Sequence, residues 1–144
     1  MAEIARRLGI ELQTIDISGP DELGAAFEAF RGGRAEGVNI VSSAMLVSFR
    51  RPIGELSLGA KFPSICQFRN MAEAGCIASY GITIDDIYVI SADQIAKLLK
   101  GAKPADLPVQ QPTKFKLVIN LKTAAALGIM VPPMLIARAE EVIE

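Results

Sequence analysis

The spacing of apolar residues alternates between strand-like and helix-like patterns through the first half of the chain. Apolar residues at every second position predict a strand over Glu11–Ile17, and helical spacing predicts a helix over 23–30. Short apolar runs at Gly37–Val41 and Ser64–Phe68 predict strands covered on both faces, with a helix beginning near Arg51 between them. This order of strand, helix, strand, helix and strand predicts a parallel sheet with right-handed crossovers and helices on both faces.

The second half begins with shorter elements and then shows one long amphipathic pattern. A turn of helix is expected at Asn70–Ala74. Apolar residues at helical spacing predict a helix over Ile84–Leu99, with acidic residues in its first turn and lysines near its end, as the helix macrodipole favours. Gly101 is expected to end this helix.

The C-terminal part of the chain predicts a strand that runs directly into a helix. The strand is expected over Phe115–Asn120, and the small-residue helix over Leu121–Leu127, closed by Gly128. A last helix is expected over Pro133–Ile143. Because the strand cannot bury its apolar face alone, we expect it to pair with an edge of the earlier sheet or with a second copy of the chain.

Composition narrows the classes of function. The chain has 144 residues, 51% of them apolar and 22% charged, which is typical of one globular domain. Its net charge of −1 provides no basic surface for nucleic acid, and no apolar run reaches the roughly 20 residues that span a bilayer. Residues 1–8 carry charges in a helical pattern, so we expect no signal peptide in this chain.

Histidine is absent, which excludes Ser–His and Cys–His catalytic pairs and the commonest metal ligand. The spacing of the two cysteines, Cys66 and Cys76, matches no zinc or redox motif. Buried thiols are the expected state. A disulfide stays open as an alternative if the two segments are neighbouring strands.

Two stretches of the chain, read in order, resemble a bacterial family. They are FRNMAEAGCIASYG, residues 68–81, and LLKGAKPADLPVQQPTKFKLVINLKTAAALGI, residues 98–129. With the helix between them, they are similar to the substrate-binding proteins of ABC transporters, in the branch related to tryptophan and aromatic-amino-acid uptake. The connector KGAKPADLPV, the junction KFKLVINLKTA and the VPP turn follow in the same order, which makes the resemblance specific.

The resemblance implies a type I periplasmic-binding fold, which has two Rossmann-like lobes joined by a multi-strand hinge. We accordingly expect an α/β fold with a three-layer, Rossmann-like parallel sheet. Residues 1–80 would form the second lobe, and residues 81–144 a return crossing with C-terminal elements of the first lobe. Family members are much longer, so the chain corresponds to their C-terminal half. Such a fragment is compatible with a homodimer or a domain swap.

The implied function is that of a solute-binding component of an ABC-type importer, non-enzymatic and without cofactor or metal. It would bind a small polar ligand such as an amino acid in the cleft between the lobes. In the full-length protein the resemblance implies an ABC permease as partner and a periplasmic or lipid-anchored extracytoplasmic location. Two alternatives stay open: a truncated fragment that binds nothing, and a Rossmann-like regulatory or ligand-sensing domain. A phosphorylated receiver is disfavoured because no acidic pair follows Val41.

Candidate ligand-binding residues follow the predicted strands, because ligands of open parallel sheets bind at the carboxyl ends of the strands. These residues are Ser42, Ser43, Arg69, Glu73, Ser79 and Tyr80. Serine hydroxyls and backbone N–H groups can hold a carboxylate, and Glu73 can accept hydrogen bonds from an ammonium group. Each residue also has a structural alternative. The serines can cap the following turn, Arg69 can pair with Glu73 across one helical turn, and Tyr80 can be a packing aromatic.

Overall fold

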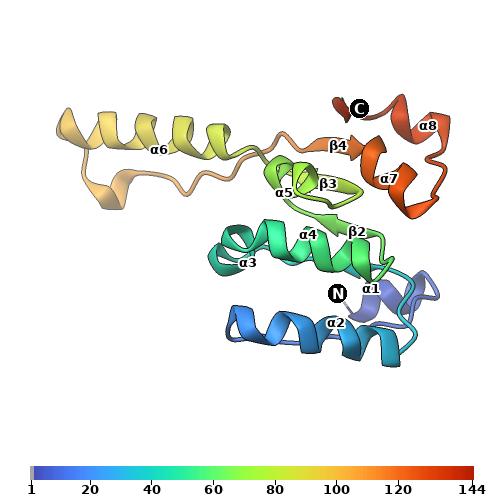
Figure 1. The fold of residues 1–144 in the computed structure, drawn as a ribbon. Coiled ribbons are helices and arrows are strands. Elements are labelled where there is room, and N and C mark those ends of the chain that lie inside the picture. Colours follow the sequence, from blue (N-terminus) through green and yellow to red (C-terminus); the bar gives the residue numbers. More distant parts are fainter. Residues whose placement is uncertain (1) are drawn as a thin grey trace.

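A five-stranded sheet with flanking helices organises the chain (Figure 1). The computed structural model describes residues 2–144. Its helices are α1 (Ala2–Arg7), α2 (Leu23–Gly32), α3 (Ala44–Ser48), α4 (Arg50–Gly59), α5 (Arg69–Glu73), α6 (Ile84–Leu99), α7 (Leu121–Leu127) and α8 (Pro133–Ile136), with 3-10 turns η1 (Pro20–Glu22) and η2 (Pro104–Asp106). Its strands are β1 (Val38–Asn39), β2 (Ser64–Cys66), β3 (Ala78–Gly81), β4 (Lys116–Asn120) and β5 (Glu141–Ile143).

The strands lie side by side in sequence order, from β1 to β5. β1, β2 and β3 are parallel, β4 runs antiparallel to β3, and β5 is parallel to β4. The predicted α/β class is therefore confirmed, with one antiparallel pair in an otherwise parallel sheet. β4, the strand predicted near the C-terminus, pairs with β3 of the same chain.

The predicted strand over Glu11–Ile17 is wrong. In the described part of the chain, these residues belong to no strand of the sheet. Ile17 packs against the core, and Gln13 Nε2 donates to the carbonyl of Ala29 in α2 at 3.5 Å. Period-two alternation indicates one covered face, but Leu12 is 46% exposed and only Ile17 packs against the core. The segment lies beside α2, which supplies no backbone hydrogen bonds of a neighbouring strand.

The predicted last helix, Pro133–Ile143, is also wrong beyond its first turn. α8 ends at Ile136, and Glu141–Ile143 forms β5. Val142 lies opposite Ile119 in the ladder with β4, so the last apolar residues form an edge strand of the sheet and are partly buried. At residues 141–143, hydrogen bonds to the neighbouring strand β4 stabilise a strand more than the short run of helically spaced apolar residues stabilises a helix.

Helix ends with strong local signals occur where the sequence predicts them. α6 spans Ile84–Leu99, and the hydroxyl of Thr83 accepts a hydrogen bond from the Asp86 N–H at its start. α7 spans Leu121–Leu127 and ends at Gly128, whose φ of 70° lies in the left-handed region that favours glycine. The strands around Gly37–Val41 and Ser64–Phe68 are shorter than predicted.

The hydrophobic core lies where α2, α4 and α5 pack together on the sheet. Its largest buried side chains include Ile53 of α4, Met71 of α5 and Cys76. Cys66 and Cys76 are free thiols with 3% and 2% of their surfaces exposed, which confirms the expectation of buried thiols. The hydrogen bond with Cys76, together with burial, raises the pKa of the Cys66 thiol.

Two glycines allow α4 to approach the end of α5 closely. A Cβ atom on Gly54 would overlap the carbonyl oxygen of Ala74. Gly75 has a φ of 131°, and a Cβ atom there would lie 2.9 Å from the Cα of Gly54. The contact between these helices therefore depends on backbone atoms that no side chain separates.

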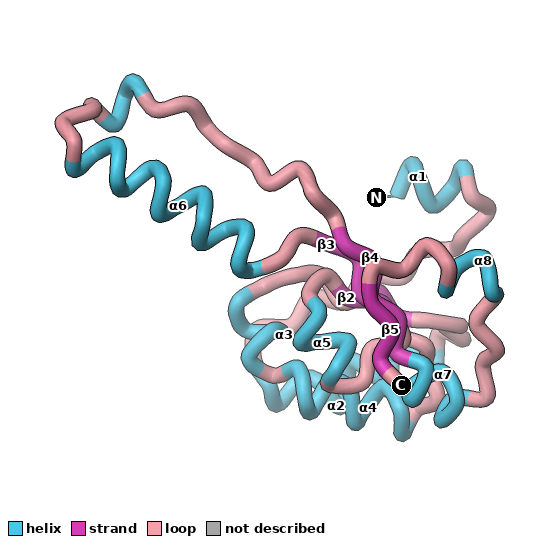
Figure 2. Tube along the Cα trace, turned by 90° about the horizontal axis from the view of Figure 1, so that it is seen from above, coloured by secondary structure: helices cyan, strands magenta, loops and turns pink. Residues whose placement is uncertain are grey.

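Residues 84–115 project from the sheet as a hairpin, called here the α6 hairpin (Figure 1, Figure 2). α6 contains no buried residue. A groove of about 450 Å³, lined mainly by apolar side chains, separates it from the returning segment.

The predicted assignment of residues 81–144 to another lobe stays a prediction. In the structure, β4 and β5 share one sheet with β1–β3. Among residues 2–144, no helix has the length and apolar character needed to cross a membrane.

Candidate ligand-binding site

A cavity of about 360 Å³ lies at the edge of the sheet where β2 and β3 end. Residues from the β2–α5 connection, the β3–α6 connection, β4 and β5 line it. Its polar lining includes Arg69, Asn70, Ser79, Asp85, Lys116 and Glu141. The carboxyl edge of parallel strands is where open α/β sheets bind their ligands, so this cavity is the candidate site.

Strand register places several of these side chains on one face. Ser79 lies opposite Val118, and Val118 lies opposite Glu141, so the three residues follow one another across the sheet. Lys116, two residues before Val118, extends from the same face of β4 and lies opposite Gly81. A Cβ atom on Gly81 would overlap the backbone that follows β2. Glycine at this position therefore allows the end of β2 to close one side of the cavity.

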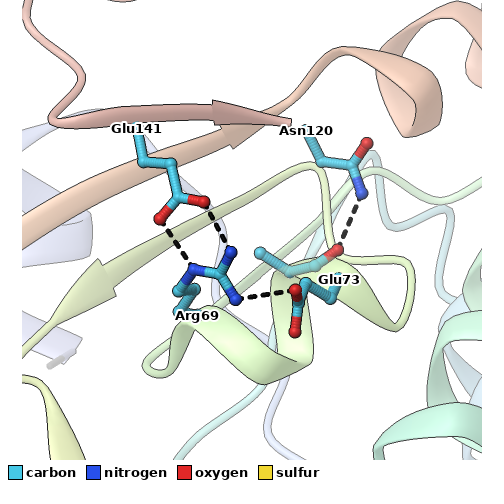
Figure 3. A network of polar contacts seen from close by, with 5 residues as sticks. Arg69, Glu73, Asn120 and Glu141 are labelled. Atoms are coloured by element: carbon cyan, nitrogen blue, oxygen red, sulfur yellow. Dashed lines mark hydrogen bonds and ion pairs between the residues drawn. The ribbon is translucent and has the colours of Figure 1, made fainter. Parts of the chain in front are cut away.

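Two carboxylates hold the guanidinium of Arg69 (Figure 3). Its Nε and Nη2 donate to the two carboxylate oxygens of Glu141 at 2.7 and 2.6 Å, and its Nη1 donates to Glu73 at 2.6 Å. The hydrogen bonds to Glu141 and to Glu73 raise the pKa of Arg69, and the hydrogen bond from Arg69 lowers the pKa of Glu141. The cluster joins α5 to β5 beside the cavity.

The lowered pKa of Glu141 makes part of the folding stability depend on pH. The unfolded chain has an ordinary glutamate pKa of about 4.3. Above about pH 4.3, the ion pair therefore makes its full contribution to the free energy of unfolding. This contribution is lost as the pH falls through the lower pKa that Glu141 has in the folded state. Because Arg69 and Glu141 are partly exposed, we expect at most about 1 kcal/mol. Urea unfolding should show a stability gap between wild type and Glu141→Gln that shrinks on acidification; a constant or growing gap would contradict this.

Asn120 anchors the elements beneath the site (Figure 3). Its side chain is buried, with 4% of the residue exposed. Nδ2 donates to the carbonyl of Ala72 in α5 at 2.8 Å, and Oδ1 accepts from the N–H of Thr123 in α7 at 3.0 Å. One side chain thus joins β4, α5 and α7, and thereby supports the helix that bears Arg69.

Two of the six residues predicted from the sequence, Arg69 and Ser79, line the cavity. Ser79 is only 1% exposed. Glu73 is not part of the lining but lies next to it through its ion pair with Arg69. That pair spans one turn of α5, as in the structural alternative considered for these residues.

The other three predicted residues lie outside this cavity. Ser42 and Ser43 follow β1 and are exposed, and Ser43 Oγ accepts a hydrogen bond from the Leu46 N–H at 3.1 Å, which caps α3. Tyr80 is 60% exposed and stacks on Phe115 with ring centroids 5.6 Å apart. Ligand contact by these three residues stays a prediction.

Sequence reasoning missed three charged residues of the cavity, namely Asp85, Lys116 and Glu141. The alternation of the predicted strand places Lys116 and Val118 on one face, which was a usable signal. Asp85 was interpreted only as a favourable charge at a helix start. Glu141 gave no signal, because its position in the sheet depends on a strand pairing that replaces the predicted last helix.

Comparison with models of protein families shows the family to which the chain belongs. Residues 1–143 match the family model described as ABC transporter substrate binding protein. The chain therefore belongs to this family, which is a family of binding proteins rather than of enzymes. A search of curated proteins gives no match.

Several solved structures share the fold. A conserved domain protein from Vibrio cholerae O1 biovar El Tor aligns with a TM-score of 0.91 and 28% identity, over 98% of this chain and 47% of that chain. An ABC domain from Streptococcus pneumonia in complex with L-Trp aligns with a TM-score of 0.90 and 28% identity, over 98% and 48%. A substrate binding protein with adhesive properties from Clostridium difficile, in a ligand-free, open structure, shares the fold at a TM-score of 0.67 and 19% identity, over 99% and 47%. The chain thus spans about half the length of these neighbours.

Proposed function

We propose that the chain is part of the solute-binding component of an ABC-type importer and forms one wall of the site for a small polar ligand such as an amino acid. The observation that carries the proposal is the cavity at the carboxyl edge of β2 and β3, lined by cationic and anionic side chains. The neighbour solved with L-Trp supports an amino acid as the ligand class. Family membership supports an ABC permease as partner and an extracytoplasmic location.

We propose in addition that the α6 hairpin packs against a second lobe in the full-length protein. Its exposed apolar side chains include Tyr88, Val89 and Leu99. Surface of this kind on an otherwise unsupported helix indicates a contact that this chain does not supply. The structural neighbours are long enough to contain another lobe, since this chain covers 47% and 48% of two of them. Of residues 81–144, which were predicted to belong to another lobe, only the α6 hairpin would then contact it. β4 and β5 instead complete the sheet that β1–β3 begin.

Titration of the ¹⁵N-labelled chain with the common amino acids tests the ligand-binding proposal. We expect amide signals around the cavity to shift, with an affinity weaker than about micromolar because only one wall of the cleft is present. Calorimetry on the same samples measures tight binding if it occurs. Submicromolar affinity would contradict the one-wall arrangement. No response to any amino acid would overturn the proposal in favour of a chain that binds nothing.

A further inference from the structure

Arg69 and Glu73, two of the residues predicted to bind ligand, are already bonded to protein groups. Glu141 takes two hydrogen bonds from Arg69 and Glu73 takes one. The cluster combines one positive and two negative charges. A ligand carboxylate that approached Arg69 would therefore meet two carboxylates, and Glu73, which does not line the cavity, has an oxygen engaged by Arg69.

Two other charged side chains, Lys116 and Asp85, line the same cavity and form no salt bridge with any residue between 2 and 144. The charge of Lys116 also helps to lower the pKa of Glu141, but the hydrogen bond from Arg69 is the larger cause. The two side chains reach the cavity from different elements, because Lys116 lies at the start of β4 and Asp85 in the first turn of α6.

These positions complement a molecule that carries both charges. Lys116 has three N–H donors for a carboxylate, while Asp85 presents only acceptor oxygens for an ammonium group. Asp86, the neighbour of Asp85, accepts a hydrogen bond from the hydroxyl of Thr83 at the helix start. Asp86 therefore already supplies the negative charge that stabilises the positive end of the α6 dipole, and Asp85 is not needed for that purpose.

We propose that Lys116 binds the carboxylate of a zwitterionic ligand and that Asp85 binds its ammonium group. Arg69 is then a positioning residue that holds β5 against α5. This inference rests on the proposed solute-binding function and assigns its charge recognition to specific residues. It differs from the assignment expected from the sequence, in which Glu73 accepts from the ammonium group.

Three indole probes separate the two charges of the ligand. L-tryptophan has both groups, indole-3-propionate lacks the ammonium group, and tryptamine lacks the carboxylate. Each is titrated into ¹⁵N-labelled wild type and into two variants, Lys116→Met and Asp85→Asn. Lys114→Met and Asp106→Asn are the matched controls, because they remove the same charges at exposed positions outside the cavity lining.

We expect Lys116→Met to weaken L-tryptophan and indole-3-propionate by about three- to tenfold and to leave tryptamine unchanged. Asp85→Asn should weaken L-tryptophan and tryptamine by a similar factor and leave indole-3-propionate unchanged. Equal losses for all three probes, or equal losses in the control variants, would overturn the assignment.

The same titrations distinguish failure of this assignment from failure of the proposed function. If wild type binds L-tryptophan and both cavity variants bind it equally well, the assignment is wrong and solute binding stands. If no probe shifts any signal of wild type, and no amino acid does so either, solute binding is overturned and the assignment falls with it. ¹⁵N spectra of each variant show directly whether it retains the wild-type fold.

Discussion

Gly54→Ala should destabilise the fold by about 3 kcal/mol, which lowers the melting temperature by about 10 °C in a domain of this size. Alanine normally stabilises the interior of a helix by about 1 kcal/mol relative to glycine. Here the added Cβ atom would overlap the carbonyl oxygen of Ala74 in the backbone after α5. Backbone atoms cannot rotate away as a flexible side chain can, so α4 and α5 must separate and lose core contacts on both sides.

Gly59→Ala is the matched control in the same helix. Gly59 is the last residue of α4, and a Cβ atom there would meet no heavy atom within 4 Å. We expect this variant to equal wild type or to gain up to about 1 kcal/mol from helix propensity. Thermal and urea unfolding of both variants measure the difference. If Gly54→Ala were as stable as Gly59→Ala, the close approach of α4 to the end of α5 would be contradicted.

Asn120→Leu should cost about 2–3 kcal/mol, since it removes both hydrogen bonds of a buried side chain. The Ala72 carbonyl would lose its donor, and the Thr123 N–H at the start of α7 would lose its cap. Leucine is larger than asparagine with the same branching, so no cavity forms, and crowding at this buried site adds to the loss. The expected result is a lower urea midpoint with an unchanged slope, as for loss of stability without a change in the surface exposed on unfolding.

Ser43→Ala provides the comparison, because Ser43 also caps a helix but makes no second bond in the core. Loss of an exposed cap of this kind costs about 1 kcal/mol. The excess loss in Asn120→Leu then measures the contribution of the bond to Ala72. Equal losses in the two variants would mean that the bond from β4 to α5 contributes nothing to stability.

Local signals in the sequence predict the elements that local interactions determine. α6 and α7 begin at side chains that cap them, Thr83 and Asn120, and Gly128 ends α7 in a left-handed conformation. The parallel direction of β1, β2 and β3 also follows from the alternation of strand and helix patterns. These features need no knowledge of what lies next to them in the folded chain.

The elements that sequence reasoning misses depend on distant partners. Period-two alternation over residues 11–17 predicts a strand, but in the fold the segment lies beside a helix and has no neighbouring strand. β5 exists because β4 offers a free edge, and the helical spacing of residues 133–143 gives no hint of that edge. The candidate site follows the same rule. Arg69 and Ser79 lie in or directly after predicted strands. Glu141 lies 72 residues after Arg69 in the chain and reaches the cavity only because β5 pairs with β4.

The antiparallel pair of β3 and β4 has a mechanical consequence for the cavity. The chain enters the α6 hairpin directly after β3 and returns from it directly into β4, and the stacked rings of Tyr80 and Phe115 clamp the two strands where they diverge. A rotation of the hairpin relative to the sheet would therefore move Gly81 and Lys116, which lie opposite each other in the strand pair and line the cavity.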